Sequence, residues 1–117
     1  GQWVLCDRFT DASYAYQGAG RGLDITRITT LVDWVQKGLK PDLTLLLDIS
    51  PEEGLQRAKQ RSVPDRFEAE THAFFSKVRA GYQQLAAQEP GRIVLVDASQ
   101  PVKLVKSKLI HIINMLF

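Results

Sequence analysis

The sequence of 117 residues lacks several features, and each absence excludes a class of protein or site. Cys6 is its single cysteine, so no internal disulfide can form, as is usual in a reducing cytosol. No segment approaches the ~20 consecutive apolar residues that cross a bilayer, and the start lacks the pattern of a secretory signal peptide. The net charge of +2 is too small to indicate a nucleic-acid or membrane partner. We therefore expect a cytoplasmic protein that binds neither.

Two further absences concern chemistry. A catalytic cysteine would need a histidine partner, and His72 and His111 lie far from Cys6 in helical patterns, so we expect Cys6 to be a buried structural thiol. No Gly-Lys pair occurs anywhere, and the phosphate-binding loop G-x-x-x-x-G-K-[ST] is therefore missing. The first residue is Gly1 rather than Met, which suggests the later part of a longer chain.

The apolar residues that are present indicate an α/β domain. Nearly continuous apolar runs predict buried parallel strands over residues 3–6, 43–49 and 92–96. Apolar residues at three- and four-residue steps predict helices over residues 25–35, 71–85 and 102–116, and Ser50 followed by Pro51 predicts another helix start. Strands that alternate with helices are typical of a parallel sheet in one domain or part of one.

Polar residues follow each predicted strand. Ligands of parallel α/β sheets bind beyond the carboxyl ends of the strands. Arg8, at the first of these ends, presents a planar fork suited to a phosphate or a carboxylate, although a salt bridge would also explain it. Asp48 and Asp97, at the other two ends, are expected to cap helices.

Two more stretches carry polar groups that packing alone does not require. Arg57, Lys59 and Arg61 place positive charge at a predicted helix end, either as a solvated surface or as a hinged flap that seeks phosphates. Ser13, Tyr16 and Gln17 offer a hydroxyl, a ring and an amide, and an amide can both donate and accept, as a pyrimidine edge requires. The glycines at 18, 20 and 22 do not have dinucleotide-loop spacing and are expected to form a flexible connector.

The motifs DRFTDASYAYQGAGRG, PDLTLLLDISPEEGLQRAKQR, DRFE, GYQQLAA and RIVLVDAS occur in this order. Together they resemble the bacterial thymidylate kinases, which are P-loop nucleoside monophosphate kinases, over essentially the whole chain. The resemblance implies a three-layer α/β/α sheet of the P-loop NTPase type, incomplete because the family's first strands and P-loop are missing. It also implies transfer of the γ-phosphoryl group of ATP to dTMP, with Mg²⁺, to give dTDP.

Roles for individual residues follow from the same resemblance. Arg8 would hold the dTMP phosphate and the transferring group, with Asp7 near the metal and connected to it through water rather than as a direct ligand. The resemblance also implies a thymine and sugar pocket. The turn over residues 7–22 would supply Ser13, Tyr16 and Gln17 to it, and the later motif DRFE would supply Phe67. Phe67 stands where relatives often have Tyr, and Ala12 where many have Ser.

The resemblance also implies a lid over about residues 57–66. Its basic residues would close over the phosphates, and these are Arg57, Lys59, Arg61 and Arg66. Arg61 is the first candidate for the catalytic arginine and Arg57 the second. The loop Asp97, Ala98 and Ser99 would flank the adenine.

The missing first strand of the family would leave two strand edges unpaired in the middle of the sheet. We therefore expect residues 1–117 to be the C-terminal part of a single kinase domain, inactive alone, that pairs or exchanges strands with a second copy in a homodimer. Two alternatives remain: a non-catalytic module for nucleotide binding or assembly, and a monophosphate kinase for UMP or GMP.

Overall fold

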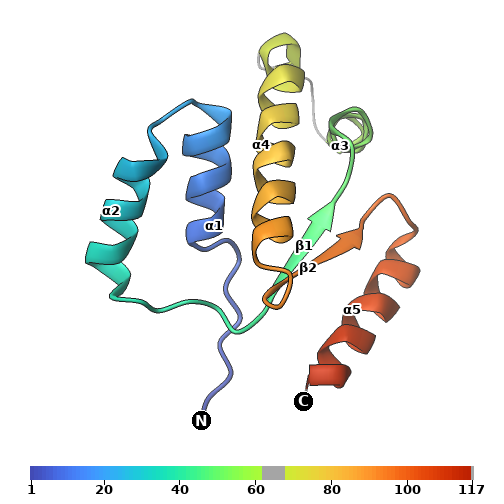
Figure 1. The fold of residues 1–117 in the computed structure, drawn as a ribbon. Coiled ribbons are helices and arrows are strands. Elements are labelled where there is room, and N and C mark those ends of the chain that lie inside the picture. Colours follow the sequence, from blue (N-terminus) through green and yellow to red (C-terminus); the bar gives the residue numbers. More distant parts are fainter. Residues whose placement is uncertain (62–67, 117) are drawn as a thin grey trace.

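The computed structural model describes residues 1–61 and 68–116, apart from the side chains of residues 68–70. Helices and two strands alternate along the chain (Figure 1), in the order α1 (Thr10–Ser13), π-helix η1 (Tyr14–Gly20), α2 (Ile25–Gln36), β1 (Thr44–Asp48), α3 (Pro51–Lys59), α4 (Glu68–Gln88), β2 (Ile93–Asp97) and α5 (Val102–Leu116). The prediction of an α/β chain with a parallel sheet is confirmed, and the bounds of α2, β1, α4, β2 and α5 lie within three residues of the predicted ones.

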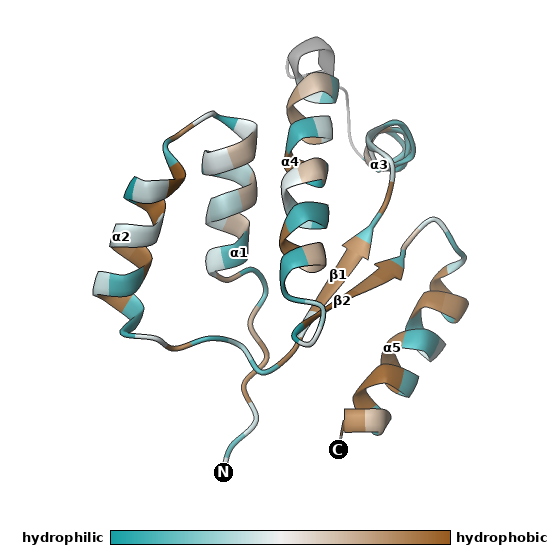
Figure 2. Cartoon of the chain, in the orientation of Figure 1, coloured by the Kyte–Doolittle hydropathy of each residue, from teal (hydrophilic) through white to brown (hydrophobic). Residues whose placement is uncertain are grey.

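The two strands pair directly with each other. β1 and β2 are parallel, with Thr44 opposite Ile93 and Asp48 opposite Asp97. Parallel strands need a long crossover, and α3 and α4 supply it. Figure 2 shows both strands as predominantly apolar segments that lie between α4 and α5. Val96 is completely buried and Ile93 nearly so, so β2 carries the centre of this small core.

The ends of the helices follow local side-chain chemistry. The Ser50 hydroxyl accepts a hydrogen bond from the Glu53 backbone N–H at 3.3 Å, and Pro51 occupies the first turn, as predicted for α3. α2 ends where Lys37 and Gly38 both take positive φ angles, of 51° and 86°.

The longest helix, α4, packs against the segment formed by α1 and η1 through small residues. A Cβ atom added to Gly20 would lie 2.6 Å from Cε2 of Phe74, and one added to Gly81 would lie 2.6 Å from Cβ of Ala19. Neither space admits a methyl group without a shift of the atoms that line it. The two helices therefore approach as closely as they do because these positions are glycine.

This packing corrects one prediction. Gly18 and Gly20 belong to η1 and contact side chains of α2 and α4, so they are not a flexible connector. Only Gly22, with φ of +73° and open space around it, behaves as a turn residue. The sequence pattern was misleading because three closely spaced glycines look alike whether they serve flexibility or close packing.

The predicted strand over residues 3–6 is also wrong. This segment belongs to no described strand, and Trp3, Val4 and Leu5 are 72%, 87% and 100% exposed. An apolar run becomes a strand only where a neighbouring backbone completes its hydrogen bonds, and the sheet of the described residues consists of β1 and β2. Cys6 is consequently exposed rather than buried, and its thiol donates to the Arg8 carbonyl oxygen at 3.2 Å.

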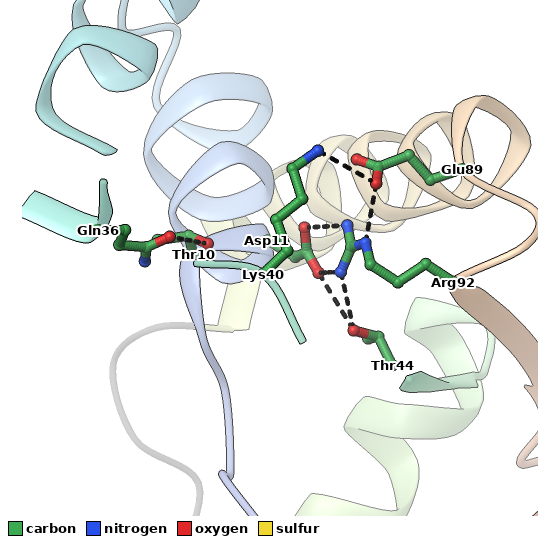
Figure 3. Close-up of polar contacts among 7 residues, drawn as sticks. All are labelled: Thr10, Asp11, Gln36, Lys40, Thr44, Glu89 and Arg92. Carbon is green, nitrogen blue, oxygen red and sulfur yellow. Dashed lines mark hydrogen bonds and ion pairs between the residues drawn. The ribbon is translucent and has the colours of Figure 1, made fainter. Parts of the chain in front are cut away.

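An ion-pair network joins four segments at the amino ends of the strands (Figure 3). Arg92 donates to both carboxylate oxygens of Asp11, at 2.7 and 2.9 Å, and to Oε2 of Glu89 at 2.8 Å. Lys40 adds a longer contact of 3.4 Å to Glu89. Arg92 lowers the pKa of the Glu89 carboxyl group, mainly through this hydrogen bond. The network fixes the start of β2 to α1 and to the end of α4, on the side away from the strand exits.

Apolar side chains also remain on the surface. On α2, Leu31, Trp34 and Val35 are more than half exposed, and on α5 the same holds for Val102 and Met115. In the part of the chain that the structure describes, no helix has both the length and the apolar character that crossing a bilayer demands.

Candidate functional site

The carboxyl ends of β1 and β2 lie side by side, as Figure 1 shows, and their last residues are Asp48 and Asp97. A cleft of about 330 Å³ opens next to this end of β1, between η1, α3 and α4. Its walls are largely apolar, and its polar lining includes Tyr16, Ser50 and Tyr82. A predominantly apolar cleft with a few polar groups, at the carboxyl end of a parallel strand, is the usual position of a ligand site in this class of fold.

Asp48 does not cap a helix, contrary to the prediction. Its two carboxylate oxygens accept hydrogen bonds from Nε and Nη2 of Arg79, both at 2.8 Å, and Gln83 adds a third bond at 3.3 Å. The Arg79 hydrogen bonds hold the pKa of Asp48 below its ordinary value. Ser50 caps α3 instead, so Asp48 serves to join the end of β1 to α4.

Arg8 lies against an aromatic ring rather than a carboxylate. Its guanidinium carbon is 5.0 Å from the centroid of the Tyr16 ring, a cation–π contact. Its backbone takes the left-handed conformation, with φ of 64°. No ion pair neutralises Arg8 within residues 1–61 and 71–116, so its charge remains available to an anionic ligand.

The Tyr16 ring is in turn held by two rings of α4. Phe74 and Tyr82 contact it edge-on, with centroid distances of 6.0 and 6.2 Å. Burial raises the pKa of the Tyr82 hydroxyl. The nearby positive charge of Arg8 lowers this pKa, and the negative charge of Asp7 raises it. Tyr16, Tyr82 and the Asp7-Arg8 pair are therefore neighbours in space, and the resemblance had assigned Tyr16 and Arg8 to one substrate site.

The predicted lid and the predicted adenine loop are in direct contact. Nη1 of Arg57 donates to the Ala98 carbonyl oxygen at 2.7 Å, and Nη2 donates to the Ser99 carbonyl oxygen at 2.8 Å. The Asp97 carboxylate accepts from the backbone N–H and the hydroxyl of Ser99, at 2.9 and 2.6 Å. Asp97 thus stabilises the turn before α5 rather than capping that helix, and Arg57 connects this turn to the end of α3.

The remaining predicted residues occupy different environments. Ser13 is half-buried at the end of α1, and Gln17 is exposed on η1. Lys59 is the last residue of α3 and Arg61 follows in an exposed turn. Arg66 and Phe67 lie outside the described residues.

Three residues near the cleft were not singled out as functional from the sequence, namely Phe74, Arg79 and Tyr82. Tyr82 belongs to the apolar stripe of the predicted helix, where a phenol looks like any core residue. Arg79 stands next to Val78 of that stripe, and a charged residue at the margin of a buried helix face was a signal for an ion pair.

Within the described residues, no three Asp, Glu, His or Cys side chains converge as potential metal ligands.

These features define the class of the molecule: a parallel α/β domain whose polar side chains gather where the strands end. The family model described as thymidylate kinase matches residues 1–109. A thymidylate kinase of Methylococcus capsulatus is 62% identical over 107 residues, which cover 92% of this chain and 51% of that protein. The chain belongs to the thymidylate kinase family, as the sequence motifs indicated.

Other relatives agree with this assignment. A thymidylate kinase of Alkalilimnicola ehrlichii is 58% identical over 110 residues, covering 93% of this chain and 51% of that protein. One of Cupriavidus pinatubonensis is 50% identical over 116 residues, covering 99% of this chain and 57% of that protein. The chain spans about half the length of the curated relatives it matches.

Proposed function

We propose that this chain supplies the dTMP-binding half of a kinase that transfers the γ-phosphoryl group of ATP to dTMP, giving dTDP. The observation that carries the proposal is Arg8, whose guanidinium lies over the Tyr16 ring beside an open cleft and has no carboxylate partner among the described residues. A planar cation held in this way suits a phosphate group, because it can donate two parallel hydrogen bonds.

In this proposal the pyrimidine ring lies near η1. Tyr16 provides a wall of the base and sugar pocket, while Ser13 and Gln17 provide hydrogen-bonding groups for the thymine edge, with Phe67 closing the sugar side. Arg8 binds the phosphate. Asp7 neighbours Arg8 and would hold Mg²⁺ through bound water, and the metal, bound together with ATP, would neutralise phosphate charge.

The basic end of α3 forms the lid in the same proposal. Arg61 is exposed at the end of the described segment and is the catalytic candidate that stabilises charge on the transferring phosphoryl group. Lys59 and Arg66 add positive charge to the lid. Arg57, the second catalytic candidate, also connects the lid to the adenine loop formed by residues 97–99.

The whole protein would have a complete three-layer α/β/α fold with a central parallel sheet, and it would act in the cytoplasm. The other half of such a protein would supply the phosphate-binding loop that residues 1–117 do not contain, since positioning of phosphates is most of what phosphoryl-transfer catalysis requires. A homodimer is the assembly we propose for it, with the exposed apolar residues of the chain as candidates for contact surfaces.

The proposal is tested with a hybrid kinase, in which this chain replaces the matching segment of the Methylococcus capsulatus relative. The hybrid is expected to phosphorylate dTMP with ATP and Mg²⁺ in a coupled assay, in preference to UMP and GMP. Preference for UMP or GMP, or no turnover of any monophosphate by a folded hybrid while the parent relative turns over dTMP, would contradict it.

A further inference from the structure

We propose that Phe74 and Tyr82 of α4 are positioning residues that fix the orientation of Tyr16, and thereby shape the pocket for a pyrimidine nucleoside monophosphate. The inference rests on the proposed function for the identity of the ligand. Its geometric part, that two rings of α4 clamp a ring of η1, stands on contacts between described residues.

The contacts form a chain in which two neighbouring rings each carry a cation. Arg8 lies over Tyr16, whose ring meets Phe74 edge-on, and Arg21 lies 4.4 Å from the centroid of the Phe74 ring. Tyr82 contacts Tyr16 with an interplanar angle of 83°, and Phe74 does so at 62°. Edge-on pairs place the positive rim of one ring against the negative face of another, so they fix angle as well as distance.

The spacing of Phe74 and Tyr82 along α4 allows both rings to contact Tyr16. Phe74 and Tyr82 are eight residues apart, so about two turns of helix separate them on one face, with the buried Val78 between them. Gly20 has no Cβ, and a Cβ there would lie 2.6 Å from Phe74 and 2.9 Å from Val78. The missing side chain is what lets Phe74 reach η1.

The arrangement leaves Tyr16 defined on several sides but open toward the cleft. Tyr16 and Tyr82 both line the cleft of about 330 Å³, together with Phe75 and Val78 of α4. A flat ring held edge-on by its neighbours offers a rigid wall, which a ligand with a flat base and a sugar can use without ordering the protein first. Loss of either clamp should therefore weaken binding of the monophosphate and leave binding of ATP largely unchanged.

The kinetic test uses the hybrid kinase with Tyr82→Leu, Tyr82→Phe and Phe74→Leu. We expect Tyr82→Leu and Phe74→Leu to raise KM for dTMP roughly three- to tenfold, the range that one lost aromatic pair gives, with KM for ATP within about twofold. Tyr82→Phe keeps the ring and should have the same KM for dTMP as the unsubstituted hybrid, because the proposal assigns the effect to the ring and not to the hydroxyl.

Tyr14→Leu is the matched control, because it removes a ring two residues from Tyr16 on the same helix. The Tyr14 hydroxyl contacts Thr29 of α2 at 3.1 Å, so this variant loses packing on the other side of η1. It should lower the melting temperature without changing the ratio of the two KM values. Equal rises in both KM values for Tyr82→Leu, or no rise in KM for dTMP, would overturn the inference.

A second measurement examines the clamp in the 117-residue chain itself, independently of turnover. The ring protons of Tyr16, assigned by selective labelling and NMR, should carry ring-current shifts that change in Phe74→Leu and Tyr82→Leu but not in Tyr14→Leu. Unchanged Tyr16 shifts would overturn the clamp. A hybrid without dTMP kinase activity, combined with the expected shifts, would instead refute the proposed function and leave the clamp in place.

Discussion

Arg8 combines a left-handed backbone with a guanidinium that lies over an aromatic ring. Its backbone is left-handed, a conformation that costs a residue with a Cβ roughly 1 kcal/mol, and its guanidinium has no carboxylate partner within the described residues. Strained backbone of this kind persists where surrounding contacts hold it, often at ligand sites. The strain and the unneutralised charge lie at the position where the sequence predicted a phosphate ligand.

Arg8→Asn separates the two properties. Asn tolerates the left-handed conformation better than Arg but carries no charge. We expect the melting temperature of the hybrid kinase to stay within about 3 °C, while kcat/KM for dTMP falls by at least about 10²-fold because a charge-assisted pair is lost. Differential scanning calorimetry and steady-state kinetics measure the two effects. A variant that unfolds early, or that keeps normal kcat/KM, would contradict this assignment.

Gly20→Ala tests the close packing of η1 on α4. The added methyl group would overlap Phe74 and Val78, and such overpacking costs about 1–3 kcal/mol of unfolding free energy. Gly91→Ala is the control, because nothing lies within 4 Å of a Cβ at that position. Urea titrations followed by circular dichroism should show the loss for Gly20→Ala alone. Equal stability of the two variants would mean that the helices are not packed as closely as described.

The ion pair between Asp48 and Arg79 predicts a pH dependence. The folded-state pKa of Asp48 is below its ordinary value, so its contribution to stability is complete above about pH 4 and is lost as the pH falls through the folded-state pKa. Asp48→Asn should cost about 1–3 kcal/mol near pH 7, and this difference should shrink below pH 4. Urea unfolding at several pH values measures it, with the exposed Asp42→Asn as the control. A difference that stays constant down to pH 2 would exclude the pair as its source.

At the scale of elements, the sequence was reliable where a pattern is local. Helix periodicity and the Ser50-Pro51 signal located α2 and α3 within one or two residues, and continuous apolar runs located β1 and β2. Residues 3–6 have the same apolar pattern and form no strand, because pairing depends on a neighbouring backbone that no pattern within the run can show.

In the candidate site too, the sequence identified residues of local motifs but not the contacts between distant segments. The family motifs identified Arg8 and Tyr16, which do lie together. They did not show that Arg57 contacts the loop over residues 97–99 or that Phe74 contacts Tyr16, since both contacts join segments more than 40 residues apart. Long-range neighbours of this kind come from the packing of α3 and α4, not from spacing in the sequence.

The contact between α3 and the loop before α5 gives a prediction for Arg57. Arg57→Lys keeps the charge but cannot bridge two carbonyl oxygens with a rigid fork. In the hybrid kinase we expect KM for ATP to rise about three- to tenfold with KM for dTMP unchanged, because one or two hydrogen bonds to the loop are lost. Steady-state kinetics with each substrate varied in turn measures this. A fall in kcat alone would assign Arg57 to the phosphoryl transfer step instead.

For the whole molecule, the exposed apolar surface and the sheet edges predict association. Trp3, Val4 and Leu5 are exposed, as are Trp34 of α2 and Met115 of α5. Surfaces of this kind promote contacts between copies, and so do unpaired strand edges. Size-exclusion chromatography with light scattering should show that the mass of the 117-residue chain rises with concentration. A well-folded monomer at all concentrations would contradict this expectation.

The link between Asp11 and Arg92 has a consequence for the order of folding. The two residues are 81 positions apart, so we expect their ion pair to form late, after the helices and the parallel strand pair have brought these distant segments together. Contacts that close last are largely absent from the folding transition state. We therefore expect that weakening the Arg92 ion pair accelerates unfolding and leaves the rate of folding nearly unchanged, which stopped-flow refolding and unfolding of Arg92→Lys would measure.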